Sequence, residues 1–210
     1  ERIAIGVAST WEKRKNLKDY ILLSKVVPRN WRIILVGLSD EQIKSIPDSI
    51  IGIKKTTNFQ ELVDLYSAAD VVLNLSLEET FGLTTVEGFA CGTPSIVYNK
   101  TASPELVTPE TGYVVEAGDI QGVSKCLSVI DEKGKQFFSK ACRERAEFYF
   151  DKDKNLLYRK YSKGFYVYAE PKKFPDFKSG VEYVTRYCGR VPISENRIIN
   201  YDGTNVTFSY

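Results

Sequence analysis

The sequence predicts an α/β protein built on a Rossmann-like, doubly wound parallel sheet, with a small α+β segment at its carboxyl end. Strand-like and helix-like stretches alternate over roughly the first 150 residues, and the strand-like stretches are almost continuously apolar. Such strands are typical of parallel sheets covered by helices on both faces. The 210 residues are 43% hydrophobic, which is ordinary for a globular protein of one large or two small domains.

Six apolar runs are expected to form the strands of this sheet. Glycine or polar residues bound the runs; Gly37 and Asn74 end two of them. In chain order the expected strands are residues 2–8, 31–36, 50–53, 71–74, 95–97 and 112–115.

Six segments between and after these runs are expected to be helical. Pro28 and Pro47 close the first two, because proline disfavours the helical conformation in the residue before it. Ser39 or Asp40 can cap the second helix, and Thr84 or Thr85 the fourth. The expected helices are residues 17–27, the short segment before Pro47, residues 59–69, the segment ending at Cys91, and residues near 120–130 and 135–150.

The main candidate site is residues 79–94, which read Glu-Thr-Phe-Gly-Leu-Thr-Thr-Val-Glu-Gly-Phe-Ala-Cys-Gly-Thr-Pro. A strand ends just before this stretch and Gly82 allows a sharp turn, so Glu79 is expected in a loop and Glu87 inside the following helix. A helix N-terminus attracts phosphate, and carboxylates accept hydrogen bonds from sugar hydroxyls. The stretch therefore suits a sugar joined to a phosphate; the alternative is a solvated helix with ordinary surface acids.

Residues 3–150 resemble the C-terminal, donor-binding domain of retaining glycosyltransferases with the GT-B fold, the large group 1 family. The glutamate spacing, Phe-Gly-Leu at 81–83, Ala-Cys-Gly-Thr-Pro at 90–94 and the basic loop at 7–17 carry the resemblance. It implies a nucleotide-sugar donor bound at the carboxyl ends of the strands. It also implies sugar transfer with retention, in bacterial polysaccharide or glycan biosynthesis.

The resemblance also assigns roles to individual residues. Glu79 is implied to contact the transferred sugar and Lys15 to neutralise the leaving diphosphate, which makes these two the expected catalytic residues. Glu87 is implied to bind the ribose hydroxyls. The remaining donor-binding positions are the backbone amides of Phe81, Gly82, Leu83 and Thr84, and Asn58 in the loop that lines the base pocket.

Two positions of the basic loop depart from the family pattern. Ser9 stands where the family has an arginine six residues before the lysine, and Asn16 stands where it has a glycine. Diphosphate binding is therefore expected to rest on Lys15 and backbone amides, helped by Arg14. We still expect Ser9 to be one of the donor-binding residues.

The composition limits the chemistry and the setting that we expect. The chain contains no histidine, and its four cysteines form no close pairs, so neither a zinc site nor a disulfide framework is indicated. We expect no cofactor and no metal, with the nucleotide-sugar as a substrate. No apolar run is long enough to span a membrane, and a cytoplasmic protein, free or at the inner face of the membrane, fits best.

The first residues of the chain bear on its acceptor. A strand-like run follows Glu1 and Arg2 directly, with no Met, so we expect a preceding segment. In the family the acceptor glycan or lipid-linked sugar binds largely to an N-terminal domain. Without it, this chain is expected to bind donor without efficient transfer.

Charge divides the chain into parts of different character. Residues 1–153 contain 19 Lys and Arg against 22 Asp and Glu, a net of −3, whereas residues 154–210 contain 10 against 5, a net of +5. The last part also holds 12 of the 26 aromatic residues. This break predicts a glycosyltransferase domain at 1–153, a junction at 154–163 and a segment of different origin at 164–210.

The last segment resembles part of the transposase domain of rolling-circle insertion sequences, which cut DNA with two tyrosines. The resemblance rests on residues 166–171, 183–187 and 190–198. A strand is expected at 164–171, a short helix at 181–188, and a hairpin at 198–210 around an Asp-Gly turn.

Tyr183 and Tyr187 would share one face of the expected short helix. They are expected to be vestigial, because the metal-binding His-hydrophobic-His motif of those enzymes cannot exist in a chain without histidine. The basic, aromatic tail is still expected to contact nucleic acid weakly.

Together these features predict a chimera of a glycosyltransferase donor domain and a transposase fragment. Two alternatives stay open. One is a DNA-binding remnant of a rolling-circle transposase, and the other is a nucleotide-binding domain with no catalytic partner.

Overall fold

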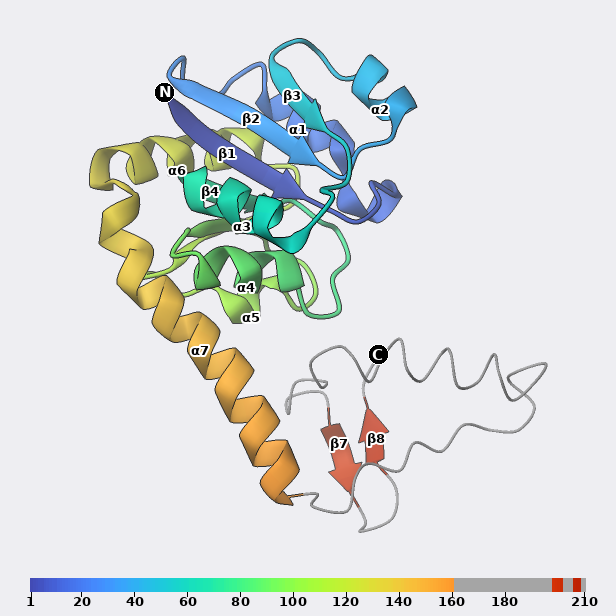
Figure 1. Ribbon diagram of the computed structural model, residues 1–210, viewed down its shortest axis with the longest axis vertical. Helices are drawn as coiled ribbons and strands as arrows, with labels where there is room; N and C mark the ends of the chain where they lie inside the picture. The colour runs from blue at the N-terminus through green and yellow to red at the C-terminus, as the bar shows by residue number, and fades with distance from the viewer. Residues whose placement is uncertain (161–197, 202–205, 209–210) are drawn as a thin grey trace, which may run out of the picture. The chain divides into compact units, whose positions relative to one another are not determined.

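The computed structural model describes residues 1–160, 198–201 and 206–208 (Figure 1). The chain divides into two compact units, Glu1–Glu147 and Phe148–Tyr210. The first unit contains the sheet and every candidate glycosyltransferase residue. The second contains the end of one long helix and a pair of short strands.

A six-stranded parallel sheet forms the centre of the first unit. Its strands are β1 (Arg2–Val7), β2 (Trp31–Val36), β3 (Ile50–Ile53), β4 (Val71–Asn74), β5 (Ser95–Tyr98) and β6 (Gly112–Val115). Their order across the sheet is β3-β2-β1-β4-β5-β6, and all neighbours are parallel. This order confirms the predicted doubly wound fold. The order reverses between β1 and β4, which is where ligands bind in such sheets.

Helices cover both faces of the sheet (Figure 1). In chain order the helical elements of the described residues are a 3-10 turn η1 (Lys13–Lys15), α1 (Leu17–Leu23), α2 (Asp40–Ser45), α3 (Phe59–Ala68), α4 (Leu83–Ala90), α5 (Ser103–Leu106), α6 (Ile120–Lys133) and α7 (Lys135–Lys160), the last of which continues into the second unit.

The two faces can be told apart at neighbouring residues of β1. Ile5 shares a buried cluster with Tyr66 of α3, whereas a Cβ atom on Gly6 would lie 2.7 Å from the ring of Tyr20 in α1. Successive strand residues point to opposite faces. Helices α1 and α3 therefore cover opposite faces of the sheet.

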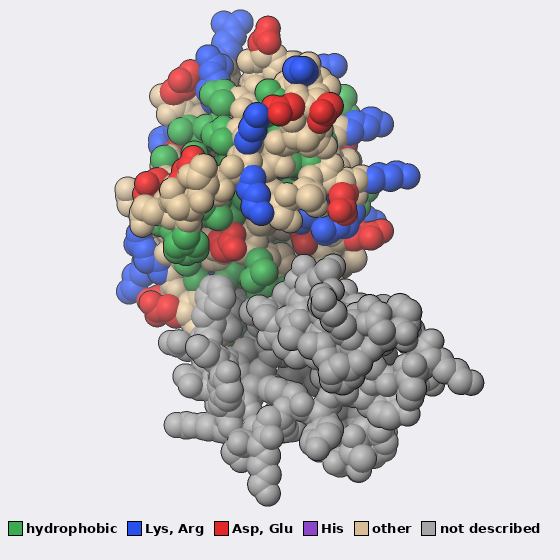
Figure 2. All heavy atoms as spheres, turned by 45° about the vertical axis from the view of Figure 1, so that its right-hand side comes forward, with side chains coloured by type: hydrophobic (Ala, Val, Ile, Leu, Met, Phe, Trp, Pro, Cys, Tyr) green, Lys and Arg blue, Asp and Glu red, His purple; other side chains and the backbone are tan. Residues whose placement is uncertain are grey.

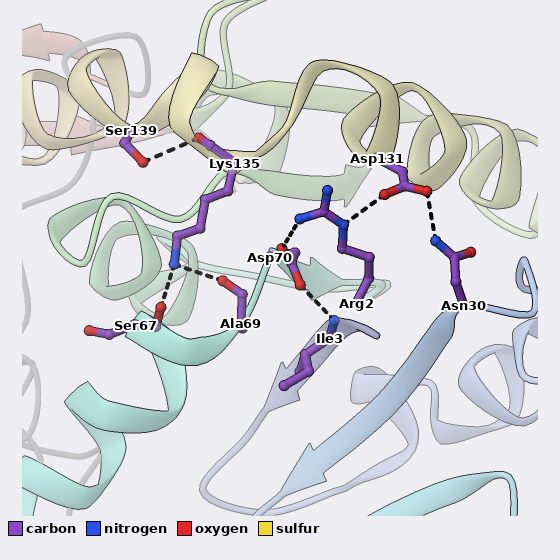
Figure 3. Close-up of polar contacts among 9 residues, drawn as sticks. All are labelled: Arg2, Ile3, Asn30, Ser67, Ala69, Asp70, Asp131, Lys135 and Ser139. Carbon is purple, nitrogen blue, oxygen red and sulfur yellow. Dashed lines mark hydrogen bonds and ion pairs between the residues drawn. The ribbon is translucent and has the colours of Figure 1, made fainter.

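The first half of α7 belongs to the core of the first unit. Phe138, Cys142 and Ala146 are buried. The ammonium of Lys135 donates to the carbonyl oxygens of Ser67, at 2.6 Å, and Ala69, at 2.7 Å, at the end of α3 (Figure 3). Apolar burial and these carbonyl contacts together fix the start of α7 beside the end of α3.

A second polar cluster joins the end of α6 to the amino ends of β1 and β4 (Figure 3). The guanidinium of Arg2 bonds to Asp70 at 2.9 Å and to Asp131 at 2.7 Å. Asp70 also accepts from the amide of Ile3 at 2.8 Å, and Asp131 accepts from Asn30 at 2.7 Å. This cluster lies at the edge of the sheet opposite the candidate site.

Two helices differ in length from the sequence prediction. Helix α1 ends at Leu23 rather than at residue 27, because the bonds from Lys25 to Leu22 and from Val26 to Leu23 tighten the chain into i−3 turns ahead of Pro28. Helix α7 continues to Lys160 rather than ending at residue 150, since no glycine or proline interrupts it. It therefore runs into the predicted junction at 154–163.

The predicted hairpin near the carboxyl terminus is present as an antiparallel pair, β7 (Ile198–Tyr201) and β8 (Val206–Phe208). The strand predicted at 164–171, the helix predicted at 181–188 and the two tyrosines, Tyr183 and Tyr187, lie outside the described residues.

Candidate functional site

The loops that carry the candidate residues follow the carboxyl ends of parallel strands. Residues 8–16 follow β1, residues 75–82 follow β4, and residues 54–58 follow β3. Parallel strands bring these loops to one edge of the sheet. Figure 2 shows a face of the molecule on which basic and acidic side chains are intermingled rather than gathered into one patch of a single sign.

The loop after β1 is fixed by an indole and carries Lys15 near its end. The ring nitrogen of Trp11 donates to the carbonyl of Val36 at 2.9 Å, and its backbone carbonyl accepts from Gln42 at 2.9 Å. Lys15 ends the turn η1, and Asn16 then adopts a left-handed conformation with φ of 57°. Asparagine tolerates this region better than most residues, so Asn16 takes the backbone conformation that the glycine of the family pattern would supply.

Three contacts join this loop to the loop after β4. The ammonium of Lys15 forms an ion pair with the carboxylate of Glu79. The amide of Leu77 donates to the carbonyl of Arg14 at 2.8 Å, and the side-chain amide of Asn16 donates to the carbonyl of Leu75 at 3.2 Å. Only 11% of the Lys15 side chain and 8% of the Glu79 side chain are exposed. The two expected catalytic residues are thus in direct contact.

Thr101 holds the backbone of Glu79 from a third loop. The amide of Glu79 donates to the Thr101 hydroxyl at 2.8 Å, and Thr101 lies in the loop after β5 with φ of 48°. The sequence does not predict this contact, because a threonine in an exposed loop has no local signal that distinguishes it.

Glycine, not threonine, begins helix α4. Gly82 is the N-cap residue, with φ of 85°, so the predicted cap by Thr84 or Thr85 is wrong. The hydroxyl of Thr85 instead accepts from the side chain of Asn74 at 3.1 Å, inside the protein. A Cβ atom at Gly82 would also lie 2.9 Å from Leu106. Both backbone angle and space therefore favour glycine here.

The predicted donor-binding amides lie at the start of α4. Phe81 and Gly82 precede the helix, and Leu83 and Thr84 are its first residues. The first amides of a helix have no acceptor within it and carry a partial positive charge. Glu79 stands four residues before the start of this helix. The carboxylate and the helix-start amides therefore lie in one short segment, and Lys15 reaches that segment through its ion pair with Glu79.

Glu87 lies in the second turn of α4 and contacts α3. The buried Tyr66 hydroxyl donates to its carboxylate at 2.9 Å. Burial, and then the charge of Glu87, raises the pKa of Tyr66 well above its usual range. The hydroxyl therefore remains a donor, and it fixes one carboxylate oxygen of Glu87.

The structure does not bring every predicted residue to this pair. Ser9 is exposed in the loop after β1, and Arg14 pairs with Glu12 at 3.2 Å. Asn58 caps α3 by accepting from the amide of Glu61 at 2.9 Å.

Asn58 also lines an open hollow of about 670 Å³ along α3. Lys15, Glu79 and Glu87 do not line this hollow. Of the predicted site residues among the described ones, Asn58 alone lines this hollow.

Within residues 1–160 and the strands β7 and β8, no group of three or more Cys, Asp or Glu side chains is placed to hold a metal ion. In the same part of the chain, no helix combines the length and apolarity needed to cross a membrane.

The sheet order and the edge site define the first unit as a doubly wound α/β domain of the kind that binds ligands at its topological switch point. The chain belongs to the group 1 glycosyl transferases, whose family model matches residues 2–130. Residues 123–210 match a second family model, described as "Putative transposase". The resemblance to group 1 glycosyltransferases is confirmed at the level of the family, and the second match supports the resemblance to a transposase.

Individual relatives agree with the first assignment. The chain is 33% identical over 135 residues to N-acetyl-alpha-D-glucosaminyl L-malate synthase of Bacillus anthracis, covering 59% of this chain and 34% of that protein. The solved sucrose-phosphate synthase of Thermosynechococcus elongatus matches with a TM-score of 0.64 and 25% identity, over 76% of this chain and 45% of that one.

A third match is to the solved C-terminal domain of a group 1 glycosyl transferase from Francisella tularensis. Its TM-score is 0.58 at 22% identity, over 70% of this chain and 86% of that domain. This chain spans about a third of the length of the Bacillus anthracis relative.

Proposed function

We propose that the first unit is the donor-binding half of a glycosyltransferase that transfers a sugar from a nucleotide-sugar with retention of configuration. The ion pair between Lys15 and Glu79 supports this most directly. A cation suited to a diphosphate and a carboxylate suited to sugar hydroxyls touch each other beside the first amides of α4. A nucleotide-sugar carries both a diphosphate and sugar hydroxyls, because its sugar is bonded directly to the diphosphate.

In this proposal each part of the donor has its own partner. The diphosphate binds Lys15 and the amides of residues 81–84, with Arg14 helping. The sugar hydroxyls bind Glu79, and the ribose hydroxyls bind Glu87, whose carboxylate Tyr66 orients at 2.9 Å. The base lies toward the loop that contains Asn58.

The proposed reaction needs no covalent intermediate on the protein and no metal. The bond between the anomeric carbon and the phosphate oxygen breaks, and its electron pair leaves with the nucleoside diphosphate. Lys15 stabilises the charge that develops there. The acceptor oxygen bonds to the anomeric carbon on the same face, and its proton passes to the leaving phosphate oxygen.

The names of the relatives support glycosyl transfer and suggest a setting. They include the glucosaminyl malate synthase, and a D-inositol 3-phosphate glycosyltransferase of Saccharomonospora viridis that is 33% identical over 122 residues. We propose a bacterial glycan or polysaccharide pathway. Because the chain spans about a third of the first relative, we assign the acceptor, a glycan or lipid-linked sugar, to a further domain.

A second candidate function rests on the other family match. Residues 123–210 resemble a transposase family, and this region carries most of the positive charge of the chain. A DNA-binding remnant would bind single-stranded DNA with an affinity that falls steeply as salt is raised.

A titration of the full chain with UDP- and GDP-sugars, beside single-stranded DNA at two salt concentrations, separates the two functions. We expect saturable binding of a nucleotide-sugar. Glu87→Gln should weaken it by about tenfold, because a neutral amide accepts hydrogen bonds from ribose less strongly than a carboxylate.

Glu110→Gln is the matched control, since Glu110 lies in the loop before β6 at the opposite edge of the sheet. Unchanged affinity in Glu87→Gln would remove Glu87 from the site. Salt-sensitive DNA binding with no saturable binding of any nucleotide-sugar would favour the second function instead.

A further inference from the structure

A buried hydrogen-bonded group begins at the residue that follows Lys15. The side-chain amide of Asn16 donates to the carboxylate of Asp19 at 2.8 Å. The same carboxylate oxygen accepts from the hydroxyl of Tyr98 at 2.6 Å. Asp19 is 9% exposed and Tyr98 is fully buried. Such a buried carboxylate is costly unless hydrogen bonds satisfy it, and here two donors do so.

The three residues come from three different parts of the fold. Asn16 ends the loop after β1, Asp19 lies in the first turn of α1, and Tyr98 is the last residue of β5. Burial, and then the hydrogen bond to Asp19, raises the pKa of Tyr98 far above its usual range, so that Tyr98 stays a donor. The group therefore ties the loop after β1 to the far side of the switch point.

The same group reaches both loops that hold Glu79. The amide of Asn16 that contacts Asp19 also donates to the carbonyl of Leu75 at 3.2 Å, at the start of the loop after β4. Tyr98 stands three residues before Thr101, whose hydroxyl holds the amide of Glu79 at 2.8 Å. A shift of this group would move the backbone on either side of the ion pair.

Asn16 makes this connection possible because it is not glycine. A glycine could adopt the same left-handed backbone conformation, with φ of 57°, but it has no side chain to bond to Asp19 or to Leu75. The departure from the family pattern thus adds contacts at the residue adjoining the proposed diphosphate-binding lysine.

We propose that Asn16, Asp19 and Tyr98 are positioning residues that hold Lys15 in place to bind the diphosphate of the donor. This inference rests on the proposed function of the first unit. It predicts that variants of these residues lose affinity for nucleoside diphosphates and keep their affinity for monophosphates, which lack the phosphate that Lys15 neutralises. A network that only stabilises the fold would affect all ligands alike.

The test compares ligands that differ by one phosphate. The full chain is titrated with uridine and guanosine diphosphates and with the corresponding monophosphates. The ratio of diphosphate affinity to monophosphate affinity is measured for each variant. Lys15→Met sets the scale of the loss. Asn16→Gly keeps the backbone conformation and removes the side chain, and we expect it to lower the ratio by about fivefold to tenfold with monophosphate affinity unchanged.

Tyr98→Phe preserves the ring and removes the donor, and it carries the test if Asn16→Gly does not fold. Ser24→Ala is the matched control, because the Ser24 hydroxyl bonds to Ile21 within the last turn after α1. We expect Tyr98→Phe to lower the ratio and Ser24→Ala to leave it unchanged.

The outcomes distinguish a failure of this positioning role from a failure of the proposed donor-binding function. If the wild type binds no nucleoside diphosphate, the proposed function fails and the inference fails with it. If Lys15→Met lowers the ratio and neither Asn16→Gly nor Tyr98→Phe does, the function stands and the positioning role is wrong. An equal loss for monophosphate and diphosphate would also overturn it.

Discussion

At the scale of single residues, the pair of Lys15 and Glu79 is unusual because both charges are almost removed from water. Their side chains are 11% and 8% exposed. Removing one member of such a pair leaves an uncompensated charge, which costs on the order of 3 kcal/mol of stability. The pair thus depends on both members, and a ligand that binds Lys15 must compete with Glu79.

We predict strong coupling between these two residues in a double-mutant cycle. Lys15→Met and Glu79→Gln should each lower the free energy of unfolding. The loss in the double variant should be smaller than the sum of the two single losses by at least about 1 kcal/mol. Urea denaturation measures all four proteins.

The ion pair of Lys54 and Asp40 serves as the control, because its members are 65% and 63% exposed. Its coupling should lie at the low end of surface pairs, below about 1 kcal/mol. Additive losses for Lys15 and Glu79 would show that the two charges do not interact in solution.

Single residues also show where prediction from the sequence ends. Lys15, Glu79 and Glu87 are proposed as site residues from the sequence alone, because their types and spacing follow the pattern of one family. Thr101 and Tyr98 could not be predicted, since each acts through a partner that only the sheet order brings near. Tyr98 and Asp19 are 79 positions apart in the chain.

At the scale of elements, helix α4 fits its strand so closely that one of its positions must be glycine. A Cβ atom at Gly88 would lie 2.5 Å from a methyl group of the buried Val72 in β4. The sequence indicates a helix here from its spacing. It cannot give the distance between helix and strand, just as it could not show that Gly82 rather than a threonine caps α4.

We predict that Gly88→Ala destabilises the protein by about 1–3 kcal/mol, although alanine favours helices, because overpacking of the core outweighs the gain in propensity. Thermal unfolding followed by circular dichroism measures the effect. Ala90→Ser on the exposed side of α4 is the control and should change stability by about 0.5 kcal/mol or less. A stabilised Gly88→Ala protein would contradict the close approach of α4 to β4.

At the scale of the whole molecule, the two family matches do not divide the chain where the structure does. The glycosyl transferase model ends at residue 130 and the transposase model begins at residue 123, whereas the first compact unit ends at Glu147. Residues 131–147 match the transposase model, but Phe138, Cys142 and Ala146 among them are buried in the core of the first unit. Helix α7 therefore contains residues of both compact units.

We predict that a protein of residues 1–147 folds and that one of residues 1–130 does not fold stably. The shorter protein lacks Phe138, Cys142 and Ala146, which are buried in the first unit. Burial of a phenylalanine alone contributes about 1.5–3 kcal/mol. It also lacks Lys135, which bonds to two carbonyls at the end of α3, and Asp131, which bonds to Arg2.

Calorimetry of both truncated proteins and the full chain tests this boundary. Residues 1–147 should unfold in one cooperative transition and bind nucleotide-sugar as the full chain does. Residues 1–130 should melt at least about 10 °C lower or show no cooperative transition, because losses of several kcal/mol exceed what a domain of this size can absorb. Equal melting of the two proteins would place the boundary at residue 130. The first half of α7 would then contribute nothing to the glycosyl transferase fold.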